Sequence, residues 1–151
     1  MIEITHDTLD PQEITARVHS ESNGAVVTFL GTTRRFTGGR EVLHLEYEAY
    51  RPMADNKLAE ISQEMRERWS VEDVSIVHRL GRLEIQDISL VVVVASPHRK
   101  EAFAACQYSV DRIKQTVPIW KKEFFEDGEV WVGSQEHAES YEHAEAATSS
   151  E

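Results

Sequence analysis

The sequence predicts an α+β fold in which a mixed or antiparallel sheet is combined with two long helices and a small β subdomain. Residues 52–69 and 97–117 repeat apolar side chains at spacings of three and four, which is typical of amphipathic helices. Several shorter stretches alternate apolar and polar residues or are continuously apolar, and the turn residues between them indicate hairpins. Strands and helices in this irregular order favour α+β over a doubly wound parallel sheet.

Length and composition describe an ordinary globular chain. Its 151 residues, 40% hydrophobic and 28% charged, are enough for one domain with a sizeable core, which we place at residues 1–133. The longest apolar run, residues 88–95, is far shorter than the roughly 20 residues of a membrane-spanning helix. Because the first residues hold neither a basic leader nor an apolar targeting segment, we expect a cytoplasmic protein without a membrane partner.

The first fifty residues carry three predicted strands and one short helix. Residues 2–5 are predicted as an edge strand, and Asp10-Pro11 is typical of a helix start, which places a helix at about residues 11–20. Residues 24–31 form a strand that enters a polar loop. Residues 42–50 alternate apolar and polar side chains, and we expect these two strands to pair as a hairpin.

The next elements are a long helix and two strands. The helix at residues 52–69 is the clearest in the chain, because its apolar residues recur at helical spacing. Strands are predicted at residues 74–80 and 88–95 around Gly81 and a polar turn. The four consecutive valines of the second strand predict that it is buried on both faces.

The last part of the body is predicted as a second long helix and a hairpin. Ser96-Pro97 is typical of a helix start. The apolar face of this helix is expected to consist of Phe103, Cys106, Val110, Ile113 and Val117. Residues 120–125 and 129–132 are predicted to form a hairpin about Asp127-Gly128.

The C-terminal residues 134–151 differ in kind from the body. They hold five glutamates and no lysine or arginine, so the net charge of -11 for the chain becomes -6 without them. We expect this acidic tail to be solvated and mobile. Its two histidines, His137 and His143, have no third ligand at a suitable spacing and do not predict a metal site.

Residues 111–124 carry lysines on two differently shaped pieces of backbone. Pro118 lacks an N–H group and disfavours helix at the preceding residue, so a helix that carries Lys114 should end near Val117 and a strand that carries Lys121 should follow. This break lets two cations seven positions apart converge into an anion site. In an acidic chain, such local clusters indicate a pocket and not a nucleic-acid surface.

Two further groups of cations lie at the ends of predicted elements. Arg34-Arg35 follows a strand, and His98-Arg99-Lys100 stands in the first turn of a helix, where unpaired N–H groups already favour anions. Any one group alone is better explained as solvated surface charge. Three groups at element ends in one acidic chain favour a binding function.

Other chemistries have little support in the sequence. Cys106 lies on the apolar face of its helix, which indicates a core residue and not a nucleophile, and a single cysteine forms no internal disulfide. His44 faces outward from its strand, and no histidine spacing supports a metal site. Glycine-rich loops that bind nucleotide phosphates are also absent from the sequence.

Five segments are informative together: residues 24–31 followed by Arg34, residues 45–50 followed by Met53, residues 77–81, residues 96–103, and residues 114–123. In this order and spacing they resemble the large, catalytic subunit of molybdopterin synthase. The resemblance covers most of residues 1–133, and five segments in order make accidental similarity improbable. It implies an α/β hammerhead-like fold.

The resemblance also implies an activity. Members of this family convert a cyclic pyranopterin monophosphate into molybdopterin in molybdenum cofactor biosynthesis. Sulfur arrives as a thiocarboxylate on the C-terminal Gly-Gly of a small ubiquitin-like carrier subunit, and a central homodimer of large subunits binds one carrier at each end, giving a heterotetramer. No cofactor or metal is implied for the large subunit, and neither nucleic acid nor membrane is a partner.

The family's site residues are carried over position by position. The substrate pocket of the family uses residues that match Thr32, Thr33, Arg34, His98, Arg99, Lys114, Lys121, Lys122 and Glu123. We expect Lys114 and Lys121 to be catalytic. The family often has a lysine where this chain has Thr32, and we hypothesise that the extra cation Arg35 replaces it.

Helix length constrains this set of residues. His98 and Lys114 are 16 positions apart, which is roughly 24 Å along a continuous helix. They cannot share a small pocket within one chain unless the helix is broken. The alternative that we favour is a pocket that combines Lys114 and Lys121 of one subunit with His98 and Arg99 of its partner.

Two other classes of function stay open at this point. A non-enzymatic adaptor that binds the tail of a ubiquitin-like protein would need a groove but not both lysines. A phosphoester hydrolase would use the same cations but needs a metal or a general base near them, and no carboxylate cluster of suitable spacing is evident.

Overall fold

The computed structural model describes residues 1–18 and 20–132, which form two four-stranded sheets, a small hairpin and three helices. In chain order the elements are β1 (Ile2–Thr5), α1 (Pro11–Ala16), β2 (Ala25–Thr32), β3 (Phe36–Thr37), β4 (Arg40–Glu41), β5 (His44–Ala49), α2 (Met53–Arg68), β6 (Asp73–Arg79), β7 (Gly81–Leu83), β8 (Ile88–Ser96), α3 (Arg99–Thr116), β9 (Ile119–Phe125) and β10 (Gly128–Val132). The mixed α+β fold is as predicted. The acidic tail, 134–151, lies outside the described residues.

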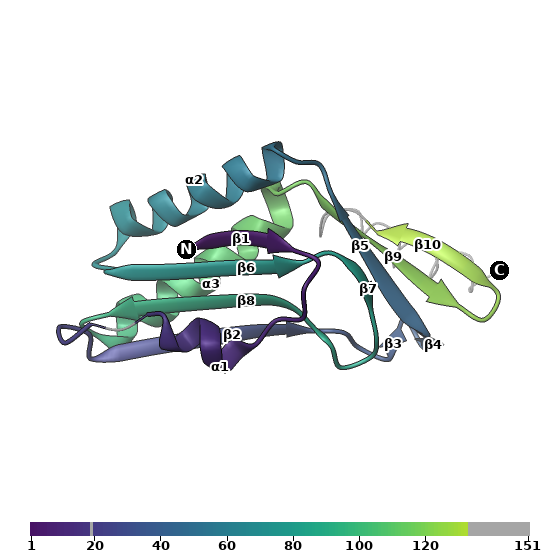
Figure 1. The fold of residues 1–151 in the computed structure, drawn as a ribbon, viewed down its shortest axis with the longest axis horizontal. Helices are drawn as coiled ribbons and strands as arrows, with labels where there is room; N and C mark the ends of the chain where they lie inside the picture. Colours follow the sequence, from purple (N-terminus) through teal and green to yellow (C-terminus); the bar gives the residue numbers. More distant parts are fainter. Residues whose placement is uncertain (19, 133–151) are drawn as a thin grey trace.

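The first sheet is mixed and has the strand order β1-β6-β8-β2. β1 pairs with β6 in parallel, whereas β6 with β8 and β8 with β2 are antiparallel. Figure 1 shows α2 and α3 on one side of this sheet and α1 on the other. The short strand β1 is at the margin of the sheet, which confirms the predicted edge strand.

The valines of β8 connect two parts of the core. Val92 and Val94 pack in the cluster that includes the apolar residues of α2 and α3, while Val91 and Val93 pack in the cluster that includes α1. All four are fully buried. Because each fully buried valine stabilises the fold by about 1.5–3 kcal/mol, both layers depend on this strand. The prediction that residues 88–95 are buried on both faces is confirmed.

The second sheet is antiparallel, with the order β10-β9-β5-β7, and lies beyond one end of the first sheet (Figure 1). β9 and β10 form the hairpin that was predicted around Asp127-Gly128. The small β subdomain of the prediction corresponds to this sheet. Among the described residues, no helix is long and apolar enough to cross a membrane.

The predicted hairpin between residues 24–31 and 42–50 is wrong. β2 pairs with β8, whereas β5 pairs with β7 and β9 in the other sheet. The reason is packing, since Val27 and Phe29 face the core cluster of the first sheet and Leu45 belongs to a separate cluster with Val42 and Phe125.

Two helix boundaries differ from prediction, and one strand was missed. α1 ends at Ala16, not near residue 20, because the chain leaves the helix to bury Val18 beside α1. α3 begins at Arg99 with His98 as N-cap, while Ser96 donates its side-chain hydrogen bond to the Ser70 carbonyl. The strand β7 was not predicted at all.

The apolar face of α3 was predicted with one error. Phe103 was placed on that face, but its side chain is 62% exposed. The helix turns Ala102, Ala105 and Ser109 toward the sheet instead, because small residues allow the close approach of α3 to β8. Cys106 and Ile113 are buried as predicted.

Candidate active site

The strand β9 presents its two adjacent lysines to opposite sides of the second sheet. Side chains alternate along a strand, so Lys121 and Glu123 share one face and Lys122 takes the other. In register with β5, Lys121 is opposite Tyr47 and Glu123 is opposite Leu45. The inner face of this strand pair therefore carries a lysine, a carboxylate and a phenol at neighbouring positions.

Lys121 and Glu123 form a partly buried ion pair. The Lys121 Nζ is 3.6 Å from Glu123 Oε1, and the Glu123 side chain is only 3% exposed. The other carboxylate oxygen, Oε2, is buried and has no hydrogen-bond partner among residues 1–18 and 20–132. Burial of an unpartnered carboxylate oxygen is costly, so this atom is suited to accept a hydrogen bond from a ligand.

The pKa of Lys121 identifies its charged neighbours. Burial lowers the pKa of Lys121 from its usual value, the Glu123 carboxylate opposes this effect, and the positive charges of Arg34 and Lys114 lower the pKa further. Arg34 and Lys114 therefore each lie close enough to Lys121 to repel its charge. Three cations against the one carboxylate of Glu123 leave an excess of positive charge that favours a bound anion.

Lys114 and Lys121 are brought together by the break that the sequence predicted. Lys114 is exposed in the last turn of α3, which ends at Thr116 with Val117 as its C-cap, and β9 begins at Ile119. The Ile119 N–H donates to the Val117 carbonyl, and the Tyr50 N–H donates to the Pro118 carbonyl. These bonds fix the corner between helix and strand, so the prediction of a helix end near Val117 is confirmed.

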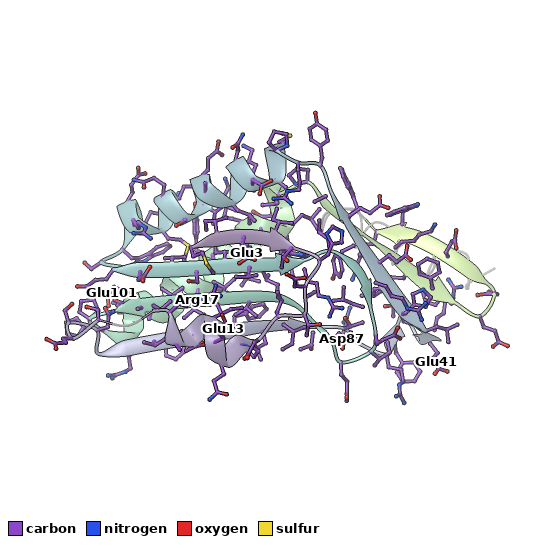
Figure 2. All side chains as sticks on the ribbon, in the orientation of Figure 1. Glu3, Glu13, Arg17, Glu41, Asp87 and Glu101 are labelled. Carbon is purple, nitrogen blue, oxygen red and sulfur yellow. The ribbon has the colours of Figure 1, made fainter. Side chains whose placement is uncertain are left out.

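Thr33 anchors the loop that carries Arg34. It is 4% exposed, and both its N–H and its hydroxyl donate to the Asp87 carbonyl, at 3.0 and 3.2 Å. The Gln86 N–H donates to the Thr33 carbonyl in return. Asp87 is labelled in Figure 2 at the end of the first sheet that faces the second sheet. Thr33 thus positions Arg34, whereas Thr32, Arg34 and Arg35 are exposed.

Tyr47 is a site residue that the sequence reasoning missed. Burial raises the pKa of Tyr47, a hydrogen bond with Ser89 lowers it, the Glu123 charge raises it and the Arg34 charge lowers it. Its ring meets the buried His78 ring edge-on at 5.1 Å. The signal in the sequence was present, because Tyr47 lies on the apolar side of an alternating strand, but only the strand register shows that it faces Lys121.

His78 supports Tyr47 from the first sheet. Its side chain is buried, and its Nδ1 lies 2.8 Å from the Arg79 carbonyl, which can only accept a hydrogen bond. Burial lowers the pKa of His78 to about 4, and the bond to Arg79 opposes that shift. The ring is therefore neutral at pH 7 and acts as a fixed wall behind Tyr47.

Lys122 does not lie with Lys121 and Glu123 on the inner face of β9. On the outer face of β9 its Nζ pairs with Glu129 at 2.8 Å and lies over the Phe124 and Trp131 rings, at 5.4 and 5.1 Å from their centroids. A backbone with alternating side chains cannot direct Lys121, Lys122 and Glu123 into one pocket. The expected contact of Lys122 with substrate has no support from this geometry.

His98 and Arg99 are not brought to the cluster either. Both are exposed at the first turn of α3, which is continuous from Arg99 to Thr116. Eighteen helical residues span roughly 27 Å, so the two ends of α3 cannot share one small pocket. Glu101, in the same first turn, is labelled in Figure 2 at the far end of the sheet from Asp87. The broken-helix alternative is thereby excluded.

Cys106 has the surroundings of a core residue. It is 5% exposed, and burial raises the pKa of its thiol to about 11, which leaves almost no thiolate at pH 7. Within the part of the chain that the structure describes, no group of three His, Cys, Asp or Glu side chains is placed to hold a metal ion. The groups available for chemistry are therefore the amines, the guanidinium, the phenol and the Glu123 carboxylate.

Comparisons with known proteins point to one family. The family model described as MoaE protein matches residues 4–116. The molybdopterin synthase catalytic subunit of Halalkalibacterium halodurans is 50% identical over 130 residues, which is 86% of this chain and 83% of that protein. The crystal structure of molybdopterin synthase from Staphylococcus aureus is similar with a TM-score of 0.83 and 47% identity, over 87% of this chain and 96% of that one.

A more distant structure has the same fold. The complex of subunits 1 and 2 of molybdopterin-converting factor from Helicobacter pylori contains a chain that is 19% identical, with a TM-score of 0.73. The match covers 87% of this chain and 89% of that chain.

Proposed function

This chain belongs to the MoaE family of molybdopterin synthase catalytic subunits, enzymes of molybdenum cofactor biosynthesis, and from this premise we propose its substrates and its chemistry. The proposed reaction converts a cyclic pyranopterin monophosphate into molybdopterin with sulfur from the C-terminal thiocarboxylate of a small ubiquitin-like carrier. The observation that carries the proposal is the convergence of Arg34 and Lys114 on Lys121, which pairs with the buried Glu123 carboxylate.

The charge of the cluster suits the two proposed substrates. A phosphate-bearing pterin and a thiocarboxylate are both anions, so bringing them together requires fixed positive charge in a partly desolvated site. Lys121 supplies this charge from β9, Arg34 from the loop that follows β2, and Lys114 from the end of α3. Preorganised cations of this kind stabilise charge that develops in a transition state, because they need no reorganisation when it forms.

The buried thiol supports a sulfur source outside this chain. Cys106 is the single cysteine of the chain and is almost wholly protonated at pH 7. It also lies in the main core cluster. A sulfur nucleophile supplied by a carrier removes the need for a reactive cysteine, which fits a site built from cations.

We assign the roles within the cluster by position. Lys114, exposed at the mouth of the site, is the residue nearest to the carrier terminus and acts as acid/base or electrostatic catalyst. Lys121, held by Glu123, stabilises the reacting substrate. Arg34 binds the phosphate and pterin together with His98 and Arg99 of the partner subunit, which makes a homodimer necessary for catalysis.

The partner subunits are part of this proposal. The Helicobacter pylori structure is, by its description, a complex of two different subunits. For this chain we propose a central homodimer with one small carrier at each end, residues 1–133 as the catalytic domain, and a cytoplasmic location.

The proposed function is tested by reconstitution. The purified chain is mixed with the thiocarboxylated carrier and the cyclic pyranopterin monophosphate, and the dithiolene product is measured. The same mixture with a carrier that ends in an ordinary carboxylate is the control and should give no product.

Two results would contradict the proposal. Tight carrier binding without product, unchanged in Lys114→Ala, would support a non-enzymatic adaptor. Release of phosphate from the pterin without any carrier would support a hydrolase.

A further inference from the structure

The turn between β7 and β8, residues 84–87, is built around the Asp87 side chain. Its carboxylate oxygen Oδ2 accepts a hydrogen bond from the Glu84 N–H at 2.9 Å, and the Asp87 N–H donates to the Glu84 carbonyl at 3.0 Å. The same carboxylate oxygen lies 3.6 Å from Arg79 Nη1. Figure 2 labels Asp87 at the end of the first sheet that faces the second sheet. One carboxylate therefore closes the turn and also joins it to β6, which ends at Arg79.

Arg79 connects this turn to the first sheet. Its Nη2 donates a hydrogen bond to the Arg82 carbonyl at 3.3 Å, so one guanidinium contacts residues on both sides of the turn. The Arg79 side chain is only 16% exposed, whereas the Asp87 side chain is 38% exposed. Solvent screens a partly buried ion pair less than an exposed one, so this contact holds Asp87 against the sheet.

Gln86, in the same turn, has an unusual backbone conformation. Its φ of 75° lies in the left-handed region, and among the described residues it is the only residue other than glycine with a positive φ. Such a conformation persists where the surrounding structure imposes it, and residues of this kind cluster at functional sites. The Gln86 side chain is exposed, but its N–H donates to the Thr33 carbonyl at 2.9 Å. Gln86 therefore acts through its backbone.

The turn holds the backbone of Thr33 at both of its peptide units. Thr33 donates from its N–H and its hydroxyl to the Asp87 carbonyl, and its own carbonyl accepts the Gln86 N–H. β2 ends one residue before Thr33, so these bonds continue where the strand stops. Because the Thr33 carbonyl belongs to the peptide unit that leads into Arg34, the bond from Gln86 also fixes the orientation of the Arg34 backbone.

We propose that Asp87 is a positioning residue for anion binding, which together with Arg79 holds the turn 84–87 in the conformation that directs Arg34 toward Lys121. The inference rests on the proposed function for the identity of the anion, but not for the connection between Asp87 and Arg34. Arg34 is exposed on a loop, and ordering such a residue when a ligand binds costs free energy. A backbone that the turn has already fixed reduces this cost and strengthens phosphate binding.

The negative charge of Asp87 separates this role from a purely electrostatic one. A carboxylate near an anion site repels the anion, so the loss of Asp87 would strengthen anion binding if its charge alone mattered. A positioning role predicts the opposite result, weaker binding, because Arg34 loses its fixed backbone. The two explanations therefore differ in the sign of the effect, and a measurement of substrate affinity distinguishes them.

Steady-state kinetics of sulfur transfer, with saturating thiocarboxylated carrier, test the connection. We expect Asp87→Ala to raise the KM for the cyclic pyranopterin monophosphate by about 10-fold and to change kcat by less than about 2-fold, since a phosphate contact acts equally in the ground state and the transition state. In an Arg34→Ala background the same substitution should have no further effect, because changes that act through one residue are not additive. Asp127→Ala is the matched control, since Asp127 pairs with Arg40 at 2.7 Å in the turn between β9 and β10, and it should leave KM unchanged.

The kinetic result can overturn the proposal in two ways. An unchanged or lower KM in Asp87→Ala, or an additive effect in the double variant with Arg34→Ala, would show that Asp87 does not act through Arg34. Asp87→Asn covers the case in which the alanine variant does not fold. It retains an acceptor for the Glu84 N–H and loses only the charge, so it should raise KM by a smaller factor of about 3.

Two substitutions at position 86 test the backbone conformation of the turn. Glycine adopts a positive φ without a steric cost, so Gln86→Gly should keep the wild-type KM. Valine is branched at Cβ and disfavours this conformation, so Gln86→Val should raise KM as Asp87→Ala does. Both variants remove the same exposed side chain, and the difference between them reports on the backbone. Equal KM values in the two folded variants contradict the proposal.

Amide hydrogen exchange tests the turn without carrier or pterin. The N–H groups of Thr33 and Gln86 should exchange at least about 10-fold faster in Asp87→Ala than in the wild type, whereas Arg34→Ala should leave both rates unchanged. Wild-type protection of both amides in a folded Asp87→Ala protein overturns the proposal. If the exchange rates change as expected but the wild-type chain transfers no sulfur, the proposed function fails and the connection between Asp87 and Thr33 stands.

Discussion

Replacing Glu123 by glutamine should shift the pH dependence of catalysis toward lower pH. The Glu123 carboxylate lies 3.6 Å from the Lys121 ammonium and opposes the effect of burial on the pKa of Lys121. Without this charge, burial and the nearby cations Arg34 and Lys114 act unopposed, so the pKa of Lys121 falls further. If the reaction needs Lys121 as a cation, activity is then lost at a lower pH than in the wild type.

The size of this shift follows from the separation and the burial of the pair. An opposite charge within about 4–6 Å changes a pKa by about 1–3 units. Because the Lys121 side chain is 28% exposed, solvent screens part of the interaction, and we expect a shift of about 1–2 units. At a pH above the pKa of Lys121 in both the wild type and the variant, a shift of this size lowers the protonated fraction of Lys121 by about 10- to 100-fold.

The assay is the rate of single-turnover sulfur transfer between pH 6 and pH 10, which product release does not limit. Glu129→Gln is the matched control, because Glu129 pairs with Lys122 at 2.8 Å on the same two strands but on the outer face. The alkaline limb of the rate profile should move in Glu123→Gln and stay in place in Glu129→Gln. An unmoved limb in Glu123→Gln, with a melting temperature that shows a folded protein, would refute the electrostatic role of Glu123.

Three further outcomes are expected. Lys114→Ala and Lys121→Ala should each slow single-turnover sulfur transfer by at least about 100-fold while the chain stays folded, and a near-normal rate in either variant removes that lysine from the mechanism. Arg99→Ala and Lys114→Ala chains, when mixed, should regain up to half of the wild-type rate per heterodimer; if mass spectrometry confirms subunit exchange but no activity returns, both residues act within one chain. Because the pKa of His78 falls to about 4 on folding, the unfolded chain binds an extra proton between about pH 6.5 and 4, and the unfolding free energy should fall by up to about 3 kcal/mol as the pH drops through that window. Urea unfolding at pH 7 and pH 4.5 should show His78→Asn losing this dependence and the exposed control His6→Asn retaining it.

Local signals in the sequence were sufficient to predict the long helices and the turn between α3 and β9. The helical spacing of Leu58, Ile61 and Met65 predicted α2, and each of these residues is almost fully buried. Pro118 predicted the end of α3 and the start of β9, since its effect on backbone conformation does not depend on the rest of the fold. The convergence of Lys114 and Lys121 was therefore predictable from residues next to one another in the chain.

Strand pairing was not predictable from the same kind of signal. The alternation of residues 42–50 shows that one face of this strand is buried. The pattern would be the same whichever strand lay beside it, so it does not identify the partner. The pairing of β5 with β9 joins segments about seventy residues apart, and nothing in either segment specifies the other. β7, with three residues, is too short to give a periodic pattern.

The pairing of β5 with β9 also determines which residues make up the site. Tyr47 faces Lys121 only because β5 and β9 are neighbours, so its role could not be inferred before the register was known. The opposite orientation of Lys121 and Lys122 could be predicted from the sequence, since adjacent residues of any strand face opposite ways. The predicted contact of Lys122 with substrate therefore stays without support from the geometry of β9.

The register of β5 and β9 decides which lysine serves the site, and apolar packing fixes that register. Leu45 and Phe125 are buried together with Val42 in the cluster that the second sheet covers. A slip of β9 by one residue would turn Lys122 inward and would move Lys121, Glu123 and Phe125 to the outer face. Exposing one large apolar side chain such as Phe125 costs about 1.5–3 kcal/mol, and the slip would also break the contact with Leu45. Side chains that take no part in the chemistry therefore determine the electrostatics of the site, so a Phe125→Ala variant that still folds is expected to disturb the Lys121–Glu123 pair before it disturbs α3 and Lys114.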